Sequence, residues 1–261
     1  MAADTLLLLT AGFFGGALNA IAGGGSFFTF PALLAVGVPS IAANATNTFA
    51  ACAGYLSGAY AFRRELAAYR HRLPELILIS LLGGLLGAGL LLQVGEAVFR
   101  QSIPWLLLLA TGLFAVGGPL NARLRRRQSR RPGAQGRPWR WLRPALLPLL
   151  LLAVCIYGGF FNAGLGILAL SYLILAGESD IHAMNGLKLL LSTAVSVAAL
   201  ALFGLRGSIA WVEGGLVLIG TLAGGYVAAH FSRQIPSGWV KGFVIVVGIG
   251  ITAYFFVETY V

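Results

Sequence analysis

Three consecutive glycines, Gly23 to Gly25, interrupt an apolar run that otherwise has the composition of a membrane-spanning helix. Glycine permits backbone conformations that other residues avoid, and the amides at the start of a helix carry partial positive charge. A weaker interruption at Gly164 and Gly166 follows the same pattern later in the chain. Amides exposed at two such breaks can bind a negatively charged group. The alternative is that these glycines only allow close packing of helices, as we expect of the pairs Gly83 with Gly87 and Gly220 with Gly224.

Lys188 is the only charged residue well inside a predicted span, on the order of 10 Å deep at the rise of an α-helix. An ammonium group inside a membrane costs about 3 kcal/mol or more unless it is paired. No acidic residue lies within a turn of Lys188 in the same span, although the side chain could extend toward Glu178 or Asp180 nearer the surface. We therefore expect an anionic ligand to neutralise Lys188.

Amide and hydroxyl side chains accompany both features, and such groups suit the oxygen atoms of an anion. They cluster where apolar residues would be expected, in the segment over residues 42–62 and in the segment that carries Lys188. Asparagines also precede both glycine breaks, where they could cap helix ends or contact a ligand. The predicted anion site comprises Gly23, Gly24, Gly25, Ser26, Thr46, Asn47, Asn162, Gly164, Gly166, Asn185, Lys188 and Ser192.

Other kinds of chemistry have weaker support in the sequence. Ser26 and His182 could form the nucleophile and base of an intramembrane enzyme, but no sequence pattern places them in contact. The histidines do not recur at metal-ligand spacing, so no metal or other cofactor is expected. Cys52 and Cys155 lie in apolar segments without the spacing of a metal pair, and we expect them to be small core residues.

The elements that must position these residues are transmembrane helices. Of the 261 residues, 58 % are hydrophobic and 10 % are charged, which is typical of a polytopic all-α membrane protein. We expect apolar segments at residues 5–22, 26–37, 42–62, 74–95, 102–119, 144–162, 165–176, 181–204, 209–231 and 238–257. Segments 26–37 and 165–176 are too short to cross a bilayer, so each is expected to be half of a hairpin or of a broken helix.

The two halves of the chain resemble each other. The sequence GGALNA at residues 15–20 aligns with GGFFNA at residues 158–163, and each stretch precedes a glycine break. This pattern predicts two repeats, over residues 1–120 and 144–261, joined by an arginine-rich linker over residues 121–143. Each repeat would hold a glycine-broken hairpin and about three full spans, as an odd number of crossings. The second repeat is therefore expected to be inverted relative to the first.

The net charge of +10 arises largely from arginines in the predicted linker and in the loop around residues 63–72. Both segments fall on the same side of the membrane in the predicted topology, and such basic loops are typical of the cytoplasmic side. Both termini would then lie on the opposite side. We expect a multi-pass protein of the inner (plasma) membrane, whose basic residues face anionic lipid rather than nucleic acid. The sequence leaves formation of a homo-oligomer open.

Two runs, GFFGGALNAIAGGGSFFTFPALLAVGVPSIAANATN and YGGFFNAGLGILALSYLILAGESDIHAMNGLKLL, resemble the paired signature of the TauE/SafE family of sulfite and organosulfonate exporters. The resemblance covers nearly the whole chain apart from the arginine-rich linker. It implies a transporter of a small sulfur-containing anion such as sulfite, sulfoacetate or thiosulfate. It also maps the family motifs onto Gly23 to Gly25, onto Ala45, Thr46 and Asn47, and onto Lys188.

These features and the resemblance together predict a secondary transporter that works by alternating access, with one repeat rocking against the other around a central site. Anions leave a negatively charged cytoplasm downhill, so export would need no coupling ion. An anion channel and, from a different class, an intramembrane enzyme are the alternatives.

Overall fold

The computed structural model describes residues 2–21, 24–130, 137–231 and 237–261, with side chains described there except at 20–21, 118–121, 124–130, 137–145, 229–231 and 237–241. The described residues form helices and no strands, which confirms the predicted all-α class. The helices are α1 (Ala2–Ile21), α2 (Ser26–Ala35), α3 (Ser40–Ala61), α4 (Arg63–Ala67), α5 (Leu73–Gln93), α6 (Glu96–Arg130), α7 (Arg137–Phe160), α8 (Leu165–Ala176), α9 (Ile181–Leu205), α10 (Trp211–Phe231) and α11 (Ser237–Tyr260).

Within the described residues, six helices are long and apolar enough to cross a membrane, namely α1, α5, α6, α9, α10 and α11. The chain is therefore a polytopic helical membrane protein. Helix α3 has 22 residues but falls outside this set, because it carries a buried group of asparagines and threonines. Helices α2 and α8 have only 10 and 12 residues, as expected for the two segments that are too short to span.

The predicted arginine-rich linker is partly helical. Helix α6 continues to Arg130 and α7 begins at Arg137, so both extend into the segment 121–143. Arginine and glutamine are good helix formers, and a run of charge does not by itself end a helix. The boundaries of the two sequence repeats stay a prediction.

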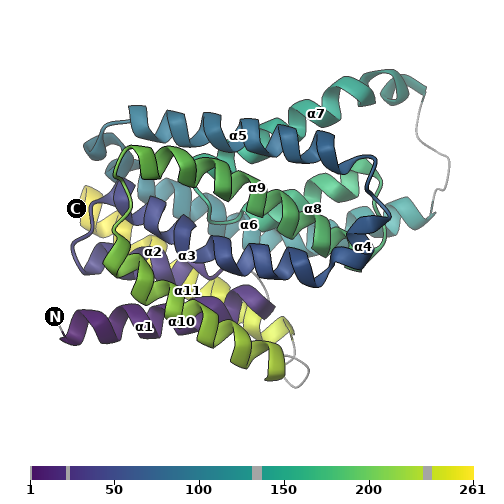
Figure 1. Cartoon of the computed structure of the whole chain (residues 1–261). Coiled ribbons are helices and arrows are strands. Elements are labelled where there is room, and N and C mark those ends of the chain that lie inside the picture. The colour runs from purple at the N-terminus through teal and green to yellow at the C-terminus, as the bar shows by residue number, and fades with distance from the viewer. Residues whose placement is uncertain (1, 22–23, 131–136, 232–236) are drawn as a thin grey trace.

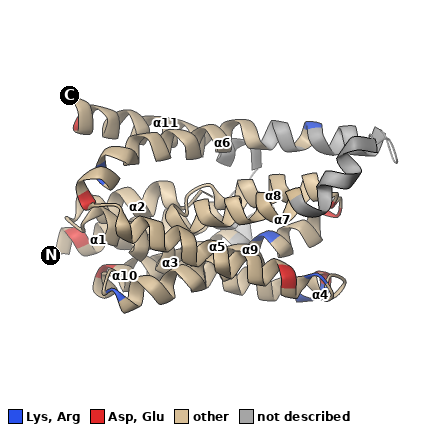
Figure 2. Cartoon of the chain, turned by 90° about the horizontal axis from the view of Figure 1, so that it is seen from above, with Lys and Arg blue, Asp and Glu red and all other residues tan. Residues whose placement is uncertain are grey.

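The helices pack in an order that differs from their order in the chain. Helices α3 and α9 lie against each other at the centre, while α1 packs on α10 and α5 packs on α7 at opposite edges (Figure 1). Helices α6 and α11 form a further pair along one face (Figure 2). Glycines allow two of these contacts, as predicted, because Gly83 and Gly87 face α7 whereas Gly220 and Gly224 face α1.

The two ends of the helix bundle differ in their contents. Both chain termini lie at one end, and α4 lies at the other end together with the beginning of α7 (Figure 1). The described charged residues gather mostly toward these two ends (Figure 2). As the sequence predicted, the arginines around α4 thus lie at the same end as the start of α7, which falls within the predicted linker. Which end faces the cytoplasm stays a prediction.

Candidate functional site

The first glycine break separates α1 from α2. Gly24 has a φ of +97°, a left-handed conformation that glycine adopts without strain. A Cβ atom on Gly24 would also lie 2.9 Å from the Phe114 ring. Gly25 has a right-handed conformation, and its Cα faces the Gly15 carbonyl so closely that a Cβ would collide with it. Gly25 therefore packs α2 on α1, and Gly23 lies outside the described residues.

The second break, between α7 and α8, also contains a glycine with a left-handed backbone conformation. Gly164 has a φ of +86° and directly precedes the first residue of α8. The Tyr157 hydroxyl donates a hydrogen bond to the Ala163 carbonyl at 2.7 Å, which holds the turn in place. Leu165 donates its amide to the Asn162 carbonyl at 3.2 Å. Within the described residues, each break thus contains one left-handed glycine that is followed by a short helix.

Both breaks border one cavity of about 60 Å³. One buried water needs roughly 10–15 Å³ on this measure, so the cavity has room for a small hydrated or partly dehydrated ion. The beginnings of α2 and α8 both reach it, and so does the middle of α9. The predicted residues that line it are Gly24, Ser26, Asn162, Gly164, Gly166, Lys188 and Ser192.

Lys188 carries the positive charge of this cavity. Its aliphatic stem runs beside Gly166, where an added Cβ would lie 3.5 Å from the Lys188 Cδ atom. The side chain is partly buried, and among the described residues no carboxylate forms an ion pair with it. A cation in such a place favours an anion as its partner.

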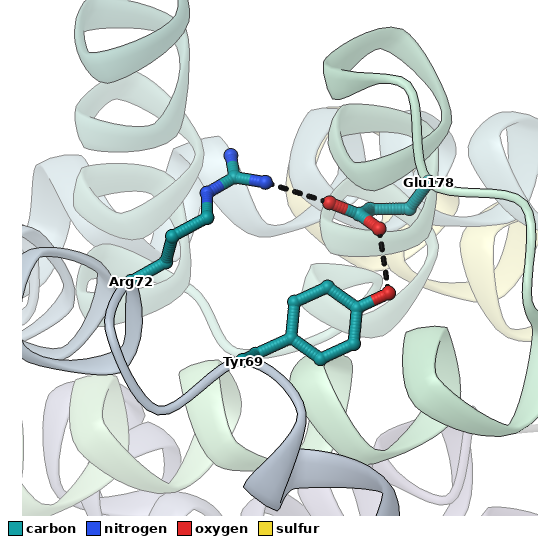
Figure 3. A network of polar contacts seen from close by, with 3 residues as sticks. All are labelled: Tyr69, Arg72 and Glu178. Atoms are coloured by element: carbon teal, nitrogen blue, oxygen red, sulfur yellow. Dashed lines mark hydrogen bonds and ion pairs between the residues drawn. The ribbon is translucent and has the colours of Figure 1, made fainter.

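Glu178, one of the two acids that could have paired with Lys188, is engaged elsewhere (Figure 3). Its carboxylate accepts a hydrogen bond from the Tyr69 hydroxyl at 2.7 Å and forms an ion pair with Arg72 at 2.8 Å. The hydrogen bond to Glu178 raises the pKa of Tyr69 to about 12. These contacts tie the turn before α5 to the turn after α8.

Asp180, the other acid, caps the start of α9. Its carboxylate accepts a hydrogen bond from the His182 amide at 3.0 Å. His182 is exposed, whereas Ser26 is buried and bonded to Asn47, so no contact joins the serine and histidine of the enzyme hypothesis. Neither Glu178 nor Asp180 neutralises Lys188.

Asn47 orients the serine at the first break. The Thr29 hydroxyl donates to the Asn47 side-chain carbonyl, and the Asn47 amide donates to the Ser26 hydroxyl at 3.1 Å. Ser26 thereby uses its oxygen as an acceptor, and it donates to no described acceptor. Its O–H group remains available to a ligand in the cavity. Asn47 itself lies behind Ser26 and does not line the cavity.

Asn162 makes the same kinds of hydrogen bond at the second break as Asn47 makes at the first. The Tyr55 hydroxyl donates to the Asn162 side-chain carbonyl at 2.8 Å, and the Asn162 amide donates to Ser196 at 3.3 Å. Both Tyr55 and Asn162 line the cavity. Near each break, therefore, a hydroxyl group donates to an asparagine, and the asparagine in turn donates to a serine.

Comparison with known proteins decides the family. The family model described as sulfite exporter TauE/SafE matches residues 8–255. The chain belongs to the TauE/SafE family. This family consists of membrane transporters, and the relatives of this TauE/SafE chain carry names of that kind.

A probable membrane transporter protein of Haemophilus influenzae is 30 % identical over 249 residues, which cover 95 % of this chain and 92 % of the relative. The probable membrane transporter protein YfcA of Escherichia coli is 29 % identical over 243 residues, covering 91 % and 84 %. The probable membrane transporter protein ORF9 of a Sinorhizobium species is 27 % identical over 250 residues, covering 94 % and 89 %. No solved structure matches the chain.

Some predicted residues of this TauE/SafE protein lie away from the cavity. The Thr46 hydroxyl accepts a hydrogen bond from the Ala210 amide at 3.0 Å, so it joins α3 to the start of α10. Asn185 lies one helical turn from Lys188 toward the α4 end and does not line the cavity. Ser192 lies one turn in the other direction and does line it. A shared helix face was therefore not sufficient to predict a shared cavity.

Sequence reasoning missed Tyr55, and it left Asn19 undecided between a cap and a ligand contact. Both line the cavity of the TauE/SafE chain. Tyr55 lies seven residues after Thr48, which is two turns further along the same face of α3. Extending the polar face of this helix by two turns would have identified it.

Proposed function

We propose that this TauE/SafE protein is a secondary transporter that exports a small sulfur-containing anion, such as sulfite, sulfoacetate or thiosulfate, by alternating access. One observation carries the proposal: the starts of two short helices border the same cavity as a lysine that no described carboxylate neutralises. In transporters, half-helix N-termini near the middle of the membrane point at anionic groups of the substrate.

The electrostatics of the cavity support an anion rather than a neutral solute. Each helix start contributes roughly half a positive charge, and Lys188 adds a full one. The described lining contains no acidic residue. Ser26 and Ser192 can donate O–H groups, and hydrogen bonds to a charged acceptor are about twice as strong as neutral ones. An oxyanion could use all of these donors at once.

The helix contacts support a pair of inverted repeats. Helix α1 of the first half packs on α10 of the second, and α7 of the second half packs on α5 of the first. In the same way α10 packs on α3, and α5 packs on α9. Exchanging the two halves maps one set of contacts onto the other, which favours access that alternates around a central site. In a bacterial inner membrane the negative cytoplasm would drive anions outward.

Counterflow in proteoliposomes tests the proposal. We expect unlabelled sulfite, sulfoacetate or thiosulfate inside the vesicles to accelerate entry of the labelled anion, with sulfate and chloride as comparison anions. Lys188→Met keeps the length of the side chain but removes a charged hydrogen-bond partner worth about 1.5–3 kcal/mol, so anion affinity should fall about tenfold or more. Arg206→Met, which removes an exposed cation from the other end of α9, is the control and should transport normally.

Two results would contradict this function. If Lys188→Met exchanges anions as fast as the unchanged protein, the cavity is not the binding site. If anions cross the membrane but counterflow is absent, the protein is an anion channel instead.

A further inference from the structure

Among the described residues, the most extensive helix contacts each join a helix of the first sequence half to a helix of the second. The most extensive contact is between α1 and α10, and the next is between α5 and α7 (Figure 1). Each pair takes one helix from the first half of the sequence and one from the second. A motion of one half against the other would have to break both contacts.

Glycines bring the backbones of these pairs into direct contact. A Cβ atom on Gly12 of α1 would lie 2.5 Å from the Val217 carbonyl oxygen of α10. A Cβ on Gly224 would collide with the Phe13 carbonyl, and one on Gly87 of α5 would collide with the Ile156 carbonyl of α7. Closely packed helices have low compressibility, so they keep one arrangement or change to another and do not deform continuously. Each pair should therefore move as one unit.

Polar contacts extend each pair into a larger group. On one side, the Ala210 amide donates to Thr46 and joins α10 to α3. On the other side, the Cys155 thiol donates to Ser80 at 3.5 Å, which adds a polar contact within the pair of α5 and α7. The ion pair of Arg72 with Glu178 then joins the start of α5 to the turn between α8 and α9. We call α1, α2, α3 and α10 the first helix group, and α5, α7, α8 and α9 the second helix group.

At the boundary between these two groups, a glycine faces a side chain and not a backbone. Helices α3 and α9 pack across it, but Gly58 of α3 faces the flexible end of Leu189, where a Cβ would lie 2.8 Å from Cδ1. Among the described side chains, the hydrogen bonds that cross it are Tyr55 to Asn162 at 2.8 Å and Asn44 to the Phe160 carbonyl at 3.0 Å. Both bonds end at the second glycine break.

The cavity lies on this same boundary. Asn19, Ser26 and Tyr55 line it from the first helix group, whereas Asn162 and Lys188 line it from the second. A binding site between two rigid units can be opened to either side of a membrane by their relative motion. A site enclosed within one unit could not.

We propose that the first and second helix groups, and not the two sequence halves, are the bodies that move against each other during transport. In this arrangement α10 travels with α1 to α3, and α5 travels with α7 to α9. The inference rests on the proposed transport function and specifies which helices carry out its conformational change.

A disulfide between α5 and α7 distinguishes motion of the two helix groups from motion of the two sequence halves. Ser80→Cys places a thiol beside the native Cys155, since the Ser80 oxygen and the Cys155 sulfur are 3.5 Å apart. We expect oxidised Ser80→Cys to show counterflow within twofold of its reduced form, because both helices belong to one group. Motion of one sequence half against the other predicts loss of counterflow on oxidation and recovery with a reductant, which would overturn the proposal.

A second cysteine pair provides the opposite control. Gly58→Cys with Leu189→Cys, in a Cys155→Ser background, lies across the boundary between the groups. Oxidation should reduce its counterflow at least tenfold relative to the reduced form of the same protein. Unchanged counterflow in the oxidised pair would also count against the two groups.

Distances between spin labels test which helices move together and need no transport measurement. Exposed positions are available on α1 at Phe14, on α10 at Leu222, on α5 at Leu82 and on α7 at Leu149. The pairs Phe14 with Leu222 and Leu82 with Leu149 should each keep one narrow distance distribution. The pairs Phe14 with Leu82 and Leu149 with Leu222 should be broad or should shift when sulfite is added.

The reverse pattern, or four equally narrow distributions, would overturn the proposal. The expected pattern together with absent counterflow would reject the proposed transport function but retain the two groups.

Discussion

At the scale of single residues, asparagines hold serine hydroxyl groups in place near the cavity, and one of these serines, Ser26, lines it. Asn47 and Asn162 each receive a hydrogen bond from a hydroxyl and donate one to a serine. Chains of this kind polarise their members and fix the direction of each donor. Lys188 supplies the positive charge of the cavity, and the hydrogen bonds between asparagines and serines fix the positions of the polar groups near it.

Tyr55→Phe tests this role of the asparagines. The substitution keeps the ring but leaves the Asn162 carbonyl without its donor, and an unsatisfied buried acceptor costs about 1–3 kcal/mol. We expect a lower thermal unfolding midpoint in detergent and weaker sulfite binding by calorimetry, because Asn162 lines the cavity. Tyr60→Phe, on the same helix but exposed, is the matched control. Equal behaviour of the two variants would mean that the Tyr55 hydroxyl has no such role.

At the scale of helices, the glycines have separate tasks that their letters do not distinguish. Gly24 and Gly164 have left-handed backbones at the two breaks, whereas Gly25 and Gly87 permit backbones to touch. Gly89 has no atom within 4 Å of an added Cβ. Spacing in the sequence predicted the contacts of the paired glycines in α5 and α10. It did not predict that Gly24 forms the turn of the first break while Gly25 packs α2 on α1.

Gly87→Ala and Gly89→Ala form a matched pair on α5. An added methyl at Gly87 must displace α7, and overpacking of this kind costs about 1–3 kcal/mol. The same change at Gly89 meets open space and gains up to about 1 kcal/mol of helix propensity. Thermal unfolding followed by circular dichroism should therefore show a lower midpoint for Gly87→Ala and an unchanged or higher one for Gly89→Ala. A similar decrease in both variants would show that the α5–α7 contact is not limiting.

At the scale of the whole molecule, the ends of the bundle define its topology. Both termini lie at the end opposite to α4 (Figure 1). Basic residues around α4 favour the cytoplasm for that end. The arrangement of the ends is therefore a property of the fold, and their orientation depends on charge.

Fusion reporters test the orientation. A reporter inserted in the turn after α4 should give a cytoplasmic signal, and reporters at both termini should give a signal from the opposite side of the membrane. Cytoplasmic signals from both termini would show that the protein is inserted the other way round.

The sequence by itself determined the class of protein, the two short helices, the glycine contacts of α5 and α10, and most of the residues that line the cavity. These follow from local properties: apolar length, glycine in an apolar run, and one lysine without a nearby acid. Only the tertiary structure decided that α1 packs on α10 and α5 on α7, and that Tyr55 meets Asn162. Such contacts depend on which helix faces meet, and no local pattern specifies the partner of a face.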